Sequence, residues 1–113
     1  MNPFATTPAP PYYVVSFTSQ RTVDDDAGYA TMAELMAQLA TQQPGYLGVE
    51  SARDASGFGI TNSYWLDEAS IVAWKRVVDH MAAQKLGRER WYARYVTRVA
   101  RVERAYGSAG PQD

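Results

Sequence analysis

A four-residue turn, Asp54-Ala55-Ser56-Gly57, separates two segments that have the pattern of β-strands. The first segment runs from Tyr46 to Arg53 and the second from Phe58 to Trp65. Turn-forming residues between two strand-like runs this close in the chain imply an antiparallel hairpin. The rest of the fold must therefore be built around this hairpin.

A strand and a helix precede the hairpin. Aromatic and β-branched residues over 12–17 predict a strand with one well-buried face. Asp24 to Asp26 supply negative charge at the start of a helix, with Thr22 or Asp24 as the cap, and the helix ends before Pro44-Gly45. Its apolar residues recur at helical spacing: Tyr29, Met32, Leu35, Met36 and Leu39.

A second helix follows the hairpin and begins at Asp67 and Glu68. We expect a break near Val78-Asp79, then a short helix from His80 to Lys85 that stops at Gly87. The apolar stripe of the first part, which should cover the sheet, is Ile71, Trp74 and Val78.

The final segment, from about Trp91 to Glu103, reads as a long strand with apolar residues on both faces. A strand that is apolar on both faces of a sheet this small predicts contact with a second copy, and hence a homodimer. The even-numbered residues Tyr92, Val96, Ala100 and Val102 would lie on one face of the strand, and the odd-numbered residues Tyr95, Thr97 and Val99 on the other.

The predicted order is thus strand, helix, strand, strand, helix, strand. This order is typical of ferredoxin-like α+β domains, in which two helices pack on one side of a four-stranded antiparallel sheet. The chain has 113 residues, enough for one domain with its own core. We assign the proline-rich residues 1–11 to a disordered N-terminal tail, residues 12–106 to the domain and residues 107–113 to a C-terminal tail.

Composition narrows the classes of function. The chain has no cysteine and one histidine, so we expect no metal site and no thiolate chemistry. No apolar run approaches the length of a membrane span, and we expect a cytoplasmic protein without a membrane partner. Nine of the eleven Lys and Arg residues lie between Lys75 and Arg104, which favours an anionic ligand. The net charge of −1 and the lack of a binding motif argue against nucleic acid.

Several motifs, in their order and spacing, resemble the antibiotic biosynthesis monooxygenase-like family of dimeric α+β barrels. They are residues 45–51 (GYLGVES), 60–65 (ITNSYW), 73–75 (AWK), 80–84 (HMAAQ) and 92–106. The resemblance covers residues 12–106 and implies a dimer whose sheets pack face to face, with a small-molecule pocket between sheet and helices in each subunit. It also implies, for some members, oxidation of phenolic or polyketide substrates by molecular oxygen without metal or flavin, and for others haem binding and degradation.

The haem-degrading branch fits this sequence poorly. Trp74 matches the position of a functional tryptophan in that branch, but Gln84 stands where its histidine ligand is expected. The asparagine of its first strand has no counterpart among Ser16, Thr18 and Ser19. We therefore expect no haem cleavage and no required cofactor.

His80 is the candidate general base, because imidazole transfers protons near neutral pH. A structural alternative is that His80, next to Asp79, caps the predicted short helix. Trp74 joins His80 as a candidate catalytic residue, and with Trp65 it would form the aromatic walls of a pocket. Core packing is the more common role for each tryptophan alone, because a large aromatic side chain on an apolar stripe is usually buried for its area.

The candidate substrate-binding residues are polar or aromatic. Asn62 and Tyr64 share one strand face, opposite to Thr61, Ser63 and Trp65, and either set could face the helices. An arginine on the final strand could bind a carboxylate or phosphate. The full set is Trp65, Tyr64, Asn62, Gln84 and Arg94.

Two functions follow as hypotheses. The first is a cofactor-independent monooxygenase that acts on a small aromatic or polyketide-like molecule. The alternative is a non-catalytic dimeric module of the same fold that binds a small molecule or haem.

Overall fold

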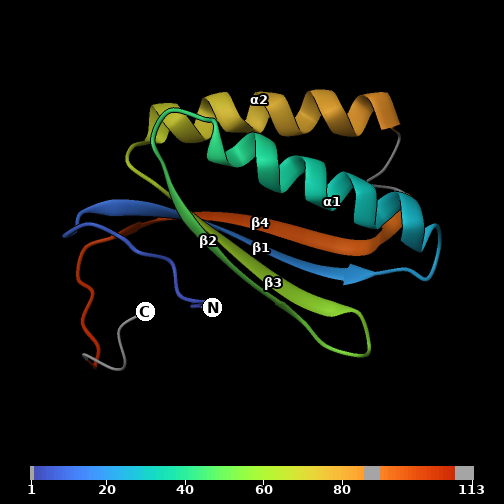
Figure 1. Ribbon diagram of the computed structural model, residues 1–113, viewed down its shortest axis with the longest axis horizontal. Helices are drawn as coiled ribbons and strands as arrows, with labels where there is room; N and C mark the ends of the chain where they lie inside the picture. The colour runs from blue at the N-terminus through green and yellow to red at the C-terminus, as the bar shows by residue number, and fades with distance from the viewer. Residues whose placement is uncertain (1, 86–89, 109–113) are drawn as a thin grey trace.

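The computed structural model describes residues 2–85 and 90–108, and it shows a four-stranded sheet with two helices on one of its faces (Figure 1). Neighbouring strands are antiparallel and their order across the sheet is β2-β3-β1-β4. This arrangement confirms the predicted ferredoxin-like α+β class. The elements are β1 (Tyr12–Arg21), α1 (Asp26–Thr41), β2 (Tyr46–Arg53), β3 (Phe58–Trp65), α2 (Glu68–Lys85) and β4 (Tyr92–Val102).

The predicted hairpin joins β2 to β3. The Asp54 carboxylate accepts hydrogen bonds from the backbone N–H groups of Ser56 and Phe58, at 2.9 and 3.1 Å. Gly57 adopts a φ of 91°, a conformation that side chains disfavour. The turn residues therefore set the register of this pair.

The predicted cap of α1 was wrong by one residue. Asp25, and neither Thr22 nor Asp24, precedes the helix and accepts a hydrogen bond from the Gly28 N–H at 3.3 Å. Asp24 is instead bound to Arg90 at 3.0 Å. Arg90 also lies 3.4 Å from the Asp25 carboxylate, so it contacts both aspartates while Asp25 alone caps the helix.

The predicted break in the second helix was also wrong, because α2 continues without interruption from Glu68 to Lys85. Asp67 caps its start by accepting a hydrogen bond from the Ser70 N–H at 2.8 Å. Across the predicted break, Lys75 pairs with Asp79 at 2.6 Å, an i,i+4 contact that supports a continuous helix. His80 therefore lies inside a helix and does not cap one.

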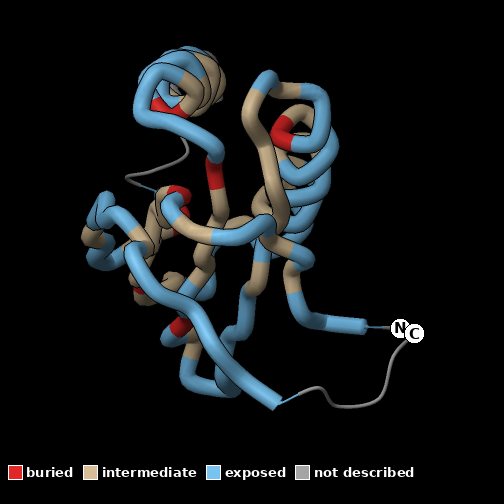
Figure 2. The backbone as a smooth tube through the Cα atoms, turned by 90° about the vertical axis from the view of Figure 1, so that its left-hand side faces the viewer, coloured by how far each residue is buried: buried red, intermediate tan, exposed pale blue. Residues whose placement is uncertain are grey.

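The two faces of the sheet have different surroundings. Because side chains alternate along a strand, Tyr13, Val15, Phe17 and Ser19 of β1 lie on one face with Trp65 of β3. We call this the helix-covered face, since Trp65 packs against α2, and the opposite one the helix-free face. Few positions are buried in the isolated chain (Figure 2). The buried apolar side chains of the described residues are Tyr12, Ala40, Trp65, Ile71 and Trp91.

A β-bulge changes the predicted parity of β4. Gln20 pairs with Arg94, but the next residue, Arg21, pairs with Tyr92, so Ala93 is an extra residue in β4. Tyr92 therefore shares the helix-covered face with Tyr95 instead of lying on the parity of Val96 and Ala100.

The N-terminal segment contains no helix or strand in its described residues 2–11, yet it contacts the helix-free face. The Ala5 N–H donates to the Glu50 carboxylate at 3.1 Å, and the Thr7 hydroxyl donates to the Tyr12 hydroxyl at 3.2 Å. A Cβ on Gly48 would lie 2.9 Å from the Ala5 Cβ. Residues 5–7 thus cover one corner of the sheet beside β2, below the sheet in Figure 1.

Two further observations concern the ends and the length of the elements. Of the predicted C-terminal tail, residues 107 and 108 are described, and they hold no helix or strand. Within the described part of the chain, neither helix combines the length and the hydropathy that crossing a bilayer requires.

Trp65→Ala tests whether the helix-covered layer depends on this ring. We expect a loss of about 3–5 kcal/mol in the free energy of unfolding, because a fully buried indole leaves a cavity. Urea titration followed by circular dichroism measures the loss. Val72→Ala is the control, since Val72 on α2 is 51% exposed and its truncation should change little; equal losses for the two variants would contradict the prediction.

Candidate functional site

A stack of two tryptophans lies on the helix-covered face, at the end of β3. The Trp65 ring is 5.8 Å from that of Trp74 on α2, with 29° between their planes. Tyr46 meets Trp65 edge-on at 5.6 Å, and the Trp65 Nε1–H donates to the Ser63 hydroxyl at 2.9 Å. Trp65 is fully buried and Trp74 is half-buried. The structure therefore brings the two predicted tryptophans together, as an aromatic wall between sheet and helix.

The other end of the same face holds two arginines around a tyrosine of α1. The Arg21 guanidinium lies 3.9 Å from the centre of the Tyr29 ring, a cation–π contact. Arg53 donates from Nη2 to the hydroxyls of Ser19, at 2.9 Å, and of Tyr29, at 3.3 Å. Ser19 is only 2% exposed. Arg21 is also paired with the Asp26 carboxylate at 2.7 Å, so Arg53 carries the positive charge of this end that no carboxylate of the described residues neutralises.

The bulge in β4 adds Tyr92 to this cluster. Its ring packs edge-on against Phe17 at 5.3 Å and Tyr29 at 5.9 Å. Burial raises the pKa of Tyr92, and the hydrogen bond with Tyr29 raises it further. Tyr92 is therefore a neutral phenol, and the aromatic layer extends from it toward the tryptophan stack through Phe17.

Tyr64 and Asn62 lie on the helix-free face, away from both tryptophans. The Tyr64 hydroxyl donates to the Glu50 carboxylate at 2.6 Å, and its ring meets Tyr12 edge-on at 5.9 Å. Burial, followed by the hydrogen bond to Glu50, raises the pKa of Tyr64 to about 12. The Asn62 Oδ1 atom is buried and has no hydrogen-bond partner among the described residues.

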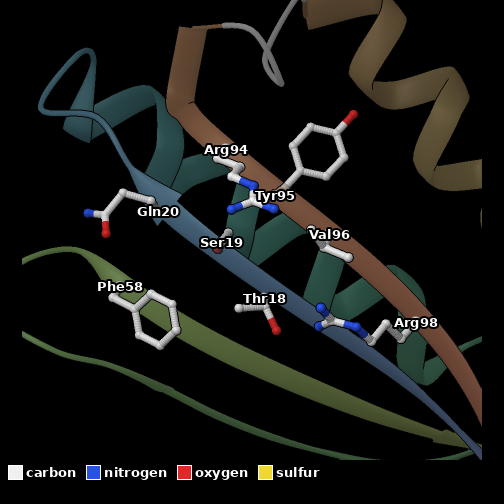
Figure 3. A pocket seen from close by; sticks show the side chains of 8 residues that line it. All are labelled: Thr18, Ser19, Gln20, Phe58, Arg94, Tyr95, Val96 and Arg98. Carbon is white, nitrogen blue, oxygen red and sulfur yellow. The ribbon is translucent and has the colours of Figure 1, made fainter.

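Arg94 also lies on the helix-free face, beside a shallow depression of about 300 Å³ (Figure 3). Thr18 and Phe58 are among the residues that line it, and Arg94 and Arg98 border it. Two guanidinium groups beside an apolar floor suit an anion that carries an apolar body. The depression is open, and it is not the pocket between sheet and helices that the sequence predicts.

His80 and Gln84 do not complete the predicted pocket. His80 is exposed on α2, six residues beyond Trp74, so the two project in different directions from the helix. The side chain of Gln84 lies outside the described residues. The single pocket predicted for Trp65, Trp74, Tyr64 and His80 is therefore not what the structure shows, because the sheet itself separates Trp65 from Tyr64.

Sequence reasoning missed the cluster formed by Ser19, Tyr29 and Arg53. These residues come from three different elements, and Tyr29 reads in the sequence as an ordinary member of a helical apolar stripe. Arg53 and Val49 are four residues apart on β2, so their side chains lie on the same face of the sheet. This spacing was the one available signal in the sequence that Arg53 lies on the helix-covered face.

The described residues hold no group of three or more histidine, cysteine or acidic side chains that could bind a metal ion. For a planar cofactor such as haem, one face of the Trp74 ring is already occupied by Trp65. What the site offers is an aromatic surface with hydroxyl groups and two cations at one end.

Tyr64→Phe tests the hydrogen bond to Glu50 through its pH dependence. The raised pKa means that folding favours the neutral phenol, so this stabilisation is present below about pH 10 and is lost as the pH rises through about 12. We expect the variant to be less stable by about 1–2 kcal/mol at neutral pH and the difference to shrink with rising pH. Urea titrations at a series of pH values measure it. Tyr106→Phe, at a site 95% exposed, is the control; a difference that stays constant with pH would contradict the assignment.

No model of a known protein family matches the chain. Among solved structures, PA3566 from Pseudomonas aeruginosa superposes with a TM-score of 0.65 at 12% identity, over 88% of this chain and 100% of that one. A protein described as a "putative monooxygenase" from Shewanella loihica PV-4 superposes with a TM-score of 0.55 at 21% identity, over 85% and 99%. Both likenesses show a shared fold.

One curated relative is much closer in sequence. The uncharacterized protein YqjZ of Bacillus subtilis (strain 168) is 50% identical over 98 residues, which cover 87% of this chain and 85% of the relative. Identity of this extent, over nearly the whole length of both proteins, shows common descent. The chain therefore belongs to the same protein family as YqjZ.

Proposed function

We propose that this protein is a cofactor-independent monooxygenase that oxidises a small aromatic or polyketide-like molecule, as a member of the antibiotic biosynthesis monooxygenase-like group. The observation that carries the proposal is the Trp65–Trp74 stack on the helix-covered face, in which Trp74 is only half-buried. The fold shared with the Shewanella loihica protein supports it.

The reaction is the oxidation of an activated CH₂ group, such as that of an anthrone, to a ketone. One O₂ is consumed, one oxygen atom enters the new carbonyl, and the other leaves as water with the two hydrogens. The substrate supplies all four electrons, so the balance needs no external reductant. Loss of one proton gives an enolate or phenolate that passes an electron to O₂.

The tryptophan end of the layer carries the chemistry in this proposal. The tryptophans hold a planar substrate by stacking, since Trp74 is only half-buried. Arg53 lies beside Ser19, six residues along β1 from Tyr13, which pairs with Trp65, so about 20 Å separates Arg53 from the stack and it does not reach a small substrate held there.

His80 has no part in this scheme, although the sequence marks it as the candidate base. His80 is exposed on α2, and its side chain projects in a different direction from Trp74, away from the Trp65–Trp74 stack. The proton passes instead to solvent at the half-buried middle of the layer, where Thr61 and Ser63 supply hydroxyl groups.

Oxygen uptake in the presence of an anthrone or a quinol tests the activity. We expect Trp74→Ala to lower kcat/KM by about 10- to 100-fold through lost stacking. His80→Ala and the exposed-site variant Val72→Ala should retain the wild-type rate. Failure of the wild-type protein to exceed the uncatalysed rate with every substrate would overturn the proposal.

The second candidate function is binding without catalysis. It is favoured by the ring and hydrogen-bond partners of Trp65 among the described residues, Tyr46, Trp74 and Ser63, because none of these three is a carboxylate or an imidazole. Such a module would stack a planar ligand but would lack a base next to it.

Titration with anthraquinone, and separately with haem, distinguishes this second candidate. Saturable quenching of tryptophan fluorescence by the quinone, reduced in Trp74→Ala, together with absent oxygen uptake, would favour the binding module. A shifted haem Soret band would extend the ligand class to haem, and an unchanged band would remove haem.

We also propose that the protein acts as a homodimer. The helix-free face supports this, because Phe58 and Ile60 on it are 45% and 42% exposed in the isolated chain.

A further inference from the structure

The depression on the helix-free face is formed by short side chains that lie between long ones (Figure 3). The register places Thr18 of β1 beside Val96 of β4 in one row across the strands. The next row toward the hairpin turn holds Phe58 and Arg94, and the row on the other side holds Arg98. Because threonine and valine are shorter than these neighbours, the floor lies at Thr18 and Val96 and the longer side chains form the walls.

The wall at the hairpin end is held in place by the turn. The Gln20 Nε2 donates to the Ser56 carbonyl oxygen at 2.7 Å, and the Phe58 N–H donates to the Asp54 carboxylate at 3.1 Å. The Phe58 ring is 45% exposed, so it offers an apolar surface beside the depression. The volume of about 300 Å³ is at the lower end of the range for small-molecule sites.

The two guanidinium groups beside the depression have no partner of opposite charge. Among the described residues, neither Arg94 nor Arg98 forms an ion pair or a hydrogen bond. Arg101, on the same strand but the opposite face, pairs with Glu103 at 3.7 Å. The only carboxylate in the four strands is that of Glu50, on the far edge strand β2, three strand spacings or about 14 Å from β4. The subunit therefore leaves this positive charge without a neutralising group.

The two arginine side chains also converge. Arg94 and Arg98 start four residues apart, about 13 Å along β4. Figure 3 shows both guanidinium groups reaching from β4 toward β1, on either side of the space above Thr18. Two cations that approach each other repel, and an anion placed between them replaces this repulsion by charge-assisted hydrogen bonds.

We propose that the depression binds a small aromatic carboxylate, within a single subunit. The carboxylate accepts hydrogen bonds from Arg94 and Arg98, whose planar guanidinium groups match its two oxygens. The Thr18 hydroxyl supplies a further donor, and the aromatic ring lies against Phe58 and Val96. We call these five residues the anion site. It lies on the opposite face of the sheet from the Trp65–Trp74 stack and is separate from the oxidation proposed above.

The apolar surface selects an aromatic carboxylate over a bare inorganic anion. A phosphate or sulfate ion would use the two guanidinium groups but would leave Phe58 and Val96 in contact with water. An aromatic ring removes apolar surface of both from water, which adds to the affinity in proportion to the area covered. The ring and the charge should therefore both be needed for binding.

Isothermal titration calorimetry of the full chain with 2-naphthoate tests the anion site. Arg94→Gln and Arg98→Gln should each raise Kd by about tenfold, because each loses a hydrogen bond to a charged group. Added salt should weaken binding, since both arginines are exposed. Arg101→Gln, on the same strand but the opposite face, is the matched control and should leave Kd unchanged.

Two further probes separate the contributions of ring and charge. 2-Naphthamide keeps the rings without the charge, and acetate keeps the charge without the rings. Each should bind more weakly than 2-naphthoate by about tenfold or more. Phe58→Ala should raise the Kd of 2-naphthoate and leave that of acetate unchanged.

Nuclear magnetic resonance locates the ligand without any variant. Addition of 2-naphthoate should shift the backbone amide signals of Thr18, Phe58 and Val96. The indole N–H signals of Trp65 and Trp74 should keep their positions, because the sheet separates these rings from the anion site.

The outcomes separate this proposal from the others. Loss of affinity in both arginine variants, with amide shifts confined to the depression, supports the anion site. A wild-type protein that does not bind 2-naphthoate overturns it, and a homodimer whose second copy fills the depression would give this result. Binding that requires Trp74 and neither Arg94 nor Arg98 also overturns it, since the ligand then lies on the tryptophan stack. Oxygen uptake reports on the proposed oxidation independently.

Discussion

The antiparallel pairing of β1 with β3 is the constraint on which the rest of the structure depends. It sets Trp65 opposite Tyr13, and the fully buried indole then packs against Trp74 of α2. Because side chains alternate strictly along a strand, this one contact assigns every other residue of the two central strands to a face. Shifting the register by one residue would move Tyr64 under the helices and expose Trp65.

The alternation separates two kinds of chemistry. The helix-covered face holds stacked aromatic rings, with the Arg21 and Arg53 guanidinium groups at one end. The helix-free face holds Asn62, Tyr64 and the open depression near Arg94. The stacked aromatic rings and the open depression thus lie on opposite sides of one sheet.

Local irregularities extend this division. The bulge at Ala93 turns Tyr92 toward α1 and enlarges the aromatic layer. The N-terminal segment, held by Ala5 and Thr7, covers a corner of the helix-free face next to Gly48, where a side chain would crowd Ala5. Neither feature follows from the average properties of its segment.

The sequence by itself determined the element order, the hairpin at Asp54–Gly57 and the ferredoxin-like class, because turn chemistry and apolar periodicity act over a few residues. It also determined that Asn62 and Tyr64 share a face opposite to Trp65, since alternation is local. Only the tertiary structure decided which of those faces lies under the helices, that Asp25 caps α1, and that His80 sits exposed on an unbroken α2. The choice of face depends on the contact of Trp65 with Trp74, which joins residues on different elements and leaves no periodic trace in the sequence.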